Sequence, residues 1–104
     1  MHKSETEYLI LKKFEDNPHL TQRELSKELG VSLGKTNYII NALIDKGWLK
    51  LKNFKRSDNK LGYNYLLTTQ GITERAILTQ KFLKKKSDEY NRLKKEIENL
   101  RKEL

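Results

Sequence analysis

Two asparagines spaced four residues apart are the side chains of this sequence best suited to recognising bases. Asn37 and Asn41 fall on one face of a predicted helix, because four residues make slightly more than one helical turn. A carboxamide carries both a donor and an acceptor, which match the major-groove edge of adenine. Tyr38 can offer its hydroxyl to a phosphate or its ring to a thymine methyl group, and Lys35 can reach guanine or a phosphate.

The charge of the chain points to the same kind of partner. The net charge is +8, and residues 31–60 carry seven basic and two acidic side chains, whereas residues 1–30 carry five basic and six acidic ones. A local excess of positive charge is typical of a nucleic-acid-binding surface. Arg56, near the tip of a predicted hairpin loop, can enter a narrow minor groove. An alternative is that the lysines of this region only discourage strand pairing at an exposed edge.

These observations give one set of expected DNA contacts. Ser32 is a helix cap first, with any phosphate contact secondary, and Gly34 either allows close approach to the DNA backbone or is a neutral surface glycine. The predicted contacts are Ser32, Gly34, Lys35, Asn37, Tyr38, Asn41, Lys55, Arg56 and Lys60.

Three predicted helices must position these side chains. Ser4 and Glu7 have the spacing of a capping box, so the first helix should begin near Glu5 and end before Pro18. The second helix should begin after Thr21, which forms a capping box with Glu24, and end at Gly30.

The third helix should run from about Leu33 to Lys46, capped by Ser32 and closed by Gly47. Its apolar side faces away from the asparagines, which predicts burial of Thr36, Ile39, Ile40 and Leu43.

Two short strands should follow. Residues 48–54 and 63–67 alternate apolar and polar side chains, the pattern of half-buried strands, and a polar connection joins them. The pair predicts a β-hairpin with a basic loop.

From Thr68 onward the sequence predicts one long helix, either unbroken or interrupted near residues 84–88. Apolar residues recur at spacings of 3 and 4 from Tyr90 to Leu104, which is the heptad pattern of a coiled coil. Phe82 and Ile77 lie off this seam and are expected to pack on the globular part instead. The predicted dimerisation residues are Ile72, Ala76, Leu83, Tyr90, Leu93, Ile97, Leu100 and Leu104.

The charges that flank the seam favour a parallel pair of helices. Glu89 and Glu96 occupy g positions, and Lys94 and Arg101 occupy e positions. In a parallel pair each g residue faces the partner's e residue five positions on, so both contacts are attractive. The alternative is a solvated helix packed only on its own domain.

Other function classes find little support in the sequence. Cysteine is absent, which excludes disulfides and thiolate metal sites and fits a cytoplasmic location. His2 and His19 stand apart, no catalytic or phosphate-cradling motif is recognisable, and we expect neither enzyme activity nor a cofactor. No apolar run is long enough for a membrane helix, and the N-terminus has no signal region.

The order of three helices, a two-stranded wing and a long helix is that of a winged helix-turn-helix, and the chain resembles MarR-type transcriptional regulators. The residues that carry the resemblance are Leu25, Leu29-Gly30-Val31-Ser32, Leu43, Lys46-Gly47-Trp48-Leu49 and Leu67-Thr68-Thr69-Gln70-Gly71. The short length and single tail helix look most like the small exopolysaccharide-associated branch. The wing departs from larger relatives in lacking their Asp-x-Arg pattern, and their ligand pocket cannot be carried over, so an effector is unknown.

The sequence therefore predicts a mainly α protein: a winged helix-turn-helix over residues 1–68 and a long C-terminal helix over residues 69–104. The expected function is that of a homodimeric regulator, commonly a repressor, that binds a palindromic site in double-stranded DNA. The alternative is a winged helix that binds a protein partner or coats DNA without recognising its sequence. The Asn37 and Asn41 amides favour the first interpretation, because a coating protein has little use for them.

Overall fold

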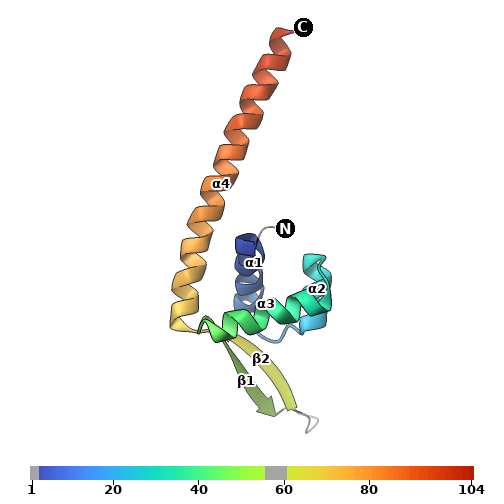
Figure 1. Ribbon diagram of the computed structural model, residues 1–104, viewed down its shortest axis with the longest axis vertical. Coiled ribbons are helices and arrows are strands. Elements are labelled where there is room, and N and C mark those ends of the chain that lie inside the picture. The colour runs from blue at the N-terminus through green and yellow to red at the C-terminus, as the bar shows by residue number, and fades with distance from the viewer. Residues whose placement is uncertain (1–2, 56–60) are drawn as a thin grey trace.

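The computed structural model describes residues 3–55 and 61–104 of the chain. Within them the elements follow the order α1 (Lys3–Asp16), α2 (Gln22–Leu29), α3 (Leu33–Asp45), β1 (Leu49–Lys55), β2 (Leu61–Leu67) and α4 (Thr69–Lys102). Helices α1 to α3 pack together, the two strands project from one end of them, and α4 rises far beyond the opposite end (Figure 1). The mainly α winged helix-turn-helix with a long C-terminal helix is thus confirmed.

The turn between α2 and α3 forms as its residues predict. The Thr21 hydroxyl accepts from the Glu24 backbone N–H at 3.1 Å, and the Glu24 carboxylate accepts from the Thr21 N–H at 3.2 Å, which completes the capping box. Gly30 ends α2 with φ +69°, a left-handed conformation that favours glycine. Ser32 then caps α3 by accepting from the Lys35 N–H at 3.1 Å.

The predicted cap of the first helix is wrong. Helix α1 already begins at Lys3, so Ser4 and Glu7 lie inside it. Glu7 is only 7% exposed, and its carboxylate accepts from the Lys46 ammonium group, just past the end of α3, at 2.7 Å. Glu7, which its spacing from Ser4 assigned to a helix cap, therefore forms a tertiary ion pair instead.

The core lies where α1, α2 and α3 meet the base of the wing. The predicted buried face of α3 is confirmed, with Thr36, Ile40 and Leu43 fully covered and Ile39 nearly so. The core side chains are Ile10, Leu11, Phe14, Leu20, Leu25, Leu29, Ile39, Ile40, Leu43, Leu49, Tyr65 and Leu78.

The wing is a β-hairpin of which only the inner end reaches the core. The strands pair antiparallel from Leu49 opposite Leu67 to Lys55 opposite Leu61. Leu49 and Tyr65 are buried, but Leu51 is 46% and Tyr63 is 55% exposed. Full burial is thus confined to the base of the wing, because the ribbon extends past the helices that cover that base (Figure 1).

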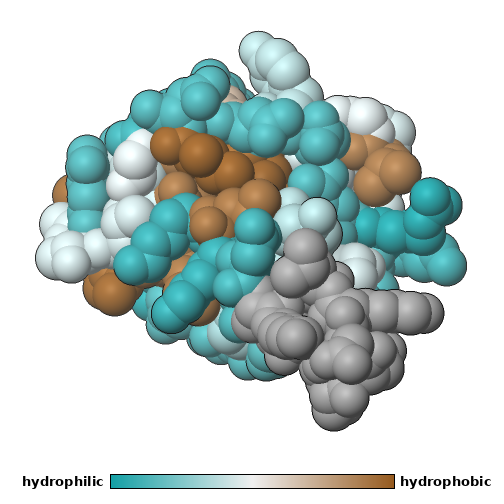
Figure 2. All heavy atoms as spheres, turned by 90° about the horizontal axis from the view of Figure 1, so that it is seen from below, coloured by the Kyte–Doolittle hydropathy of each residue, from teal (hydrophilic) through white to brown (hydrophobic). Residues whose placement is uncertain are grey.

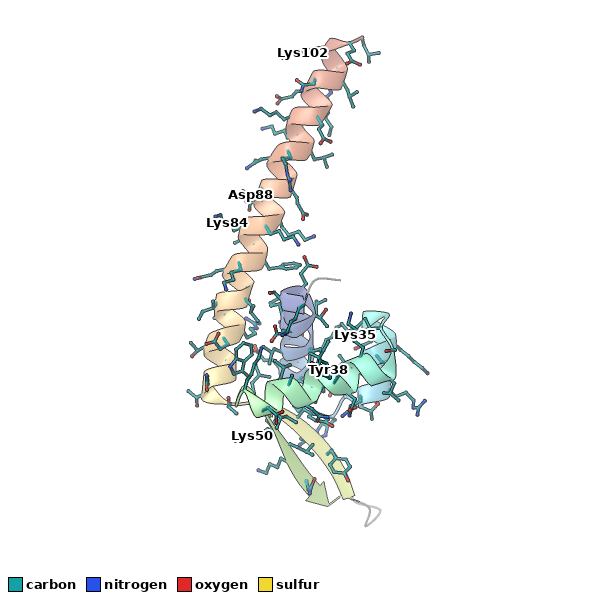
Figure 3. All side chains as sticks on the ribbon, viewed as in Figure 1. Lys35, Tyr38, Lys50, Lys84, Asp88 and Lys102 are labelled. Carbon is teal, nitrogen blue, oxygen red and sulfur yellow. The ribbon has the colours of Figure 1, made fainter. Side chains whose placement is uncertain are left out.

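Helix α4 is continuous, so the alternative of an interruption near residues 84–88 is excluded. Lys84 and Asp88 lie on an unbroken stretch of the helix (Figure 3). The stretch before them packs on α1 through Leu78, which is buried, and through a stack of Phe82 on Tyr8 with ring centroids 5.3 Å apart. Phe82 thus packs on the globular part as expected.

Two ion pairs join α4 to α1 at different heights. The Arg75 guanidinium lies 3.2 Å from the Glu15 carboxylate, and the Lys85 ammonium group donates to the Glu5 carboxylate at 2.7 Å. The hydrogen bond to Glu5 and the charge of that carboxylate raise the pKa of Lys85. Beside it a hollow of about 320 Å³ lies between the two helices, with Leu78 and Phe82 in its lining.

The beginning of α4 docks tightly on the end of α3. The Thr68 N–H donates to the Trp48 carbonyl oxygen at 3.0 Å, and the Thr68 hydroxyl bonds both the Gly47 carbonyl and the Gly71 N–H. Gly71 is buried so close to Trp48 that a Cβ atom there would lie 2.0 Å from the Trp48 carbonyl oxygen. The motif at residues 67–71 therefore fixes where the long helix starts relative to α3.

Candidate nucleic-acid interface

The face of α3 opposite the core is exposed, as its pattern predicted. Gly34, Lys35, Asn37, Tyr38 and Asn41 are all exposed, and Tyr38 reaches 74%. Figure 3 shows Lys35 and Tyr38 on this helix, with the wing projecting below it. The structure thus brings together the five predicted contacts of α3 on one side of one helix.

A line of hydrogen bonds connects the two asparagines to the wing. The Asn41 Nδ2 donates to the Asn37 Oδ1 at 3.2 Å, and the Asn37 Nδ2 donates to the Gln22 Oε1 at 3.0 Å. The Gln22 Nε2 then donates to the Tyr65 hydroxyl at 2.8 Å. We call Asn41, Asn37 and Gln22, with the Tyr65 hydroxyl at the end, the amide chain.

Gln22 and Tyr65 belong to this site although the sequence did not predict them as parts of it. Gln22 is the first residue of α2, next to the cap, and Tyr65 was predicted only from strand alternation. The two residues are 43 positions apart, and no spacing rule joins them. The one feature of the sequence that could have indicated Gln22 is its polar side chain at the start of α2, since the first turn of that helix lies near the exposed face of α3.

Ser32 has a role in the fold itself, whereas Gly34 does not. The Ser32 hydroxyl is occupied as the helix cap, in keeping with a secondary role at most in phosphate binding. No atom of the described residues lies within 4 Å of the position of a Cβ at Gly34, so none of these residues requires glycine there.

The wing presents exposed lysines next to α3. Lys50 and Lys52 are exposed on β1, and Figure 3 shows Lys50 near the base of the ribbon. The side chains of Lys55, Arg56 and Lys60 lie outside the described residues, so these contacts stay predictions. Seen from below, the described surface is largely hydrophilic, with a large apolar patch near its centre and smaller apolar areas toward its edges (Figure 2).

The predicted dimerisation seam is exposed in the single chain. On the outer half of α4, Tyr90 is 65%, Leu93 56% and Ile97 41% exposed, and Leu100 and Leu104 are exposed as well. Ile72, Ala76 and Leu83 on the inner half are also exposed. Ile77, which we expected to pack on the globular part, is 39% exposed.

Residues 3–55 and 61–104 offer no sign of two other kinds of site. No group of three or more His, Asp or Glu side chains there could hold a metal ion. No helix in this part of the chain has the length and apolarity to span a lipid bilayer.

Comparisons with known proteins agree with this architecture. A family model described as winged helix-turn-helix DNA-binding matches residues 3–50. Wild-type MarR from E. coli, in its apo form, is 27% identical with a TM-score of 0.57, covering 71% of this chain and 53% of that one. A cysteine-to-serine mutant of the same protein gives 27% identity and a TM-score of 0.56 over the same shares of the two chains.

A more distant structure extends the similarity along α4. A MarR/EmrR family transcriptional regulator from Acinetobacter sp. ADP1 covers 95% of this chain and 76% of its own, with 20% identity and a TM-score of 0.54, and so shows the shared fold alone. No curated protein sequence gave a match. The chain spans about half the length of E. coli MarR, with 53% of that chain covered. Fold, family model and structural neighbours together show a winged helix-turn-helix fold, and the chain is similar to MarR from E. coli.

Proposed function

We propose that this protein is a homodimeric transcriptional regulator that binds a two-fold-related site in double-stranded DNA with sequence specificity. The observation that carries the proposal is the exposed face of α3, on which Asn41 donates to Asn37 and Lys35 is also exposed. A helix with this polar face, backed by a second helix across a tight turn, has the form of elements that enter the major groove.

Each part of the interface then has a distinct role. Asn37 and Asn41 contact base edges, while Lys35 and the N-terminal turn of α3 approach phosphates. Lys50 and Lys52 lie on the ribbon and contribute charge toward the DNA backbone. Arg56, from the sequence, is the candidate for the minor groove.

The long helix supports pairing of two copies. Its outer half exposes a heptad seam that a second copy would cover, and its g and e charges match only in the parallel arrangement. Helix α3 and the wing lie at the other end of the molecule from the C-terminus (Figure 1). Two parallel tails would therefore present both α3 helices at the same end, which suits half-sites about 10 base pairs apart.

Occupancy of the DNA site favours repression over activation. A dimer bound to its site excludes other proteins from the DNA that it covers, and the resemblance to MarR-type regulators favours repression. The branch of small exopolysaccharide-associated relatives stays a prediction, and no effector is predicted.

The proposal is tested by selecting bound sequences from a random DNA pool and measuring affinity by fluorescence anisotropy. Asn37→Ala or Asn41→Ala should cost about 1–3 kcal/mol on the selected site and relax the preference at one base pair. Asn91→Ala is the matched control, since it removes another exposed helical asparagine, from α4 and outside the seam. If the α3 variants weaken random DNA as much as the selected site, these amides do not recognise bases.

A further inference from the structure

The amide chain couples the exposed face of α3 to a buried residue of the wing. We propose that Gln22 and Tyr65 are positioning residues, which hold the Asn37 carboxamide in the orientation that selects its base pair. This inference rests on the proposed function, and it extends the determinants of base preference to side chains that do not themselves touch a base.

Tyr65 is the fixed end of the chain. It is 9% exposed, and its ring packs against Phe14 with centroids 4.8 Å apart. Its backbone N–H also donates to the Pro18 carbonyl oxygen at 3.2 Å, which ties β2 to the α1–α2 connection. The Tyr65 hydroxyl is thus held by the core, and a hydrogen bond to it at 2.8 Å is partly shielded from water.

Gln22 transmits this fixed position to α3. Its amide nitrogen donates to the Tyr65 hydroxyl, so its amide oxygen is left to accept from Asn37, as it does at 3.0 Å. A terminal carboxamide torsion is broad and roughly two-fold, so an exposed asparagine without a partner samples both orientations of its amide. The bond to Gln22 favours one of them.

The arrangement still leaves Asn37 able to bind a base. A carboxamide has two N–H donors and two acceptor lone pairs, and the amide chain uses one of each on Asn37. One donor and one lone pair remain, which is the complement that the N7 and N6 groups of adenine require. Preorganisation of this kind lowers the cost of ordering the side chain on binding.

The most informative variant is Tyr65→Phe. It removes one oxygen atom from a buried ring and keeps the packing on Phe14. Among the described residues, the hydrogen bond that it removes is the one from Gln22. Gln22→Ala is the second variant, which removes the link itself. Tyr8→Phe is the matched control, because it takes the same atom from a ring that stacks on Phe82 of α4.

The readout is the ratio of affinities for the selected DNA site and for the same site changed at the base pair whose preference Asn37→Ala relaxes. We expect Tyr65→Phe and Gln22→Ala to lower this ratio about two- to tenfold, the effect of losing one hydrogen bond. In both variants the affinity for mixed-sequence DNA and the salt dependence of binding should stay unchanged. In Tyr8→Phe the affinity ratio should stay unchanged as well. Combined with Asn37→Ala, Tyr65→Phe should have no further effect on the ratio.

Two results would overturn the inference, and they differ in what they say of the proposed function. If Asn37→Ala relaxes the preference but Tyr65→Phe and Gln22→Ala do not, base recognition stands and the positioning role is wrong. If Asn37→Ala itself leaves every base preference intact, both the positioning role and the assignment of Asn37 to base recognition are wrong.

Discussion

Two glycines in helices should respond to alanine with opposite signs, and Gly71 is the sharper case. Helix propensity alone favours alanine over glycine by up to about 1 kcal/mol in a helix. At Gly71, however, an added Cβ atom would lie 2.0 Å from the Trp48 carbonyl oxygen and 2.9 Å from its carbonyl carbon. Both atoms belong to the backbone, so no side chain can swing away to relieve the contact.

The size of the effect follows from what must move. Ordinary contact begins at 3.4 Å, so the start of α4 would have to separate from Trp48 by about 1.4 Å. That displacement breaks the hydrogen bond from the Thr68 N–H to the Trp48 carbonyl, worth about 0.5–1.5 kcal/mol. Overpacking adds about 1–3 kcal/mol, and the propensity gain offsets part of it. We expect Gly71→Ala to lower the free energy of unfolding by about 0.5–3.5 kcal/mol.

Urea denaturation followed by circular dichroism, at one fixed protein concentration, measures this change. Gly34→Ala is the control, because it makes the same substitution in α3 where nothing lies within 4 Å of the new atom. That variant should be up to about 1 kcal/mol more stable than the parent. If Gly71→Ala stabilises the protein as Gly34→Ala does, the close approach of α4 to Trp48 does not exist as described.

Three further predictions concern the C-terminal half of α4, the Glu7–Lys46 ion pair and the wing. Ending the chain at Lys86 keeps the Lys85–Glu5 contact to α1 but removes the outer seam, so sedimentation equilibrium should show a much weaker dimer; an unchanged dimer would place the interface in the globular part. Glu7→Ala removes the carboxylate that lies 2.7 Å from the Lys46 ammonium group. Thermal unfolding should show that the free energy of unfolding falls by about 1–3 kcal/mol. An unchanged free energy of unfolding would mean that water replaces the carboxylate at no cost. Arg56→Ala should weaken binding to all DNA sequences and reduce the salt slope by about one if it contacts a phosphate, and an unchanged slope would exclude that contact.

The dimer prediction has a separate charge test. Changing Glu89 and Glu96 to lysine reverses both expected g–e′ contacts, each worth only about 0.2–1 kcal/mol because they are exposed. Asp88 and Glu98, changed to lysine together, alter the charge equally at positions that point away from the seam. In the single chain Glu89 already lies 3.4 Å from Lys86 of its own helix, which further limits the gain from a partner.

Local signals in the sequence determined most of the architecture. The capping box at Thr21, the left-handed Gly30 and the Ser32 cap act between residues at most a few positions apart, so they formed as predicted. The two faces of α3 also follow from helical periodicity, which needs no knowledge of what covers the apolar side. The exposed positions of Asn37 and Asn41 therefore follow from the order of residues alone.

Tertiary structure decided the interactions between residues that are distant in the sequence. Glu7, predicted to be part of a helix cap, instead forms an ion pair with Lys46. Leu51 is exposed because the β-ribbon extends beyond the helices that bury its base. Tertiary structure also joined Gln22 to Tyr65 and so tied the polar face of α3 to the core. Such contacts depend on how whole elements pack, and the spacing of residues within one element carries no information about them.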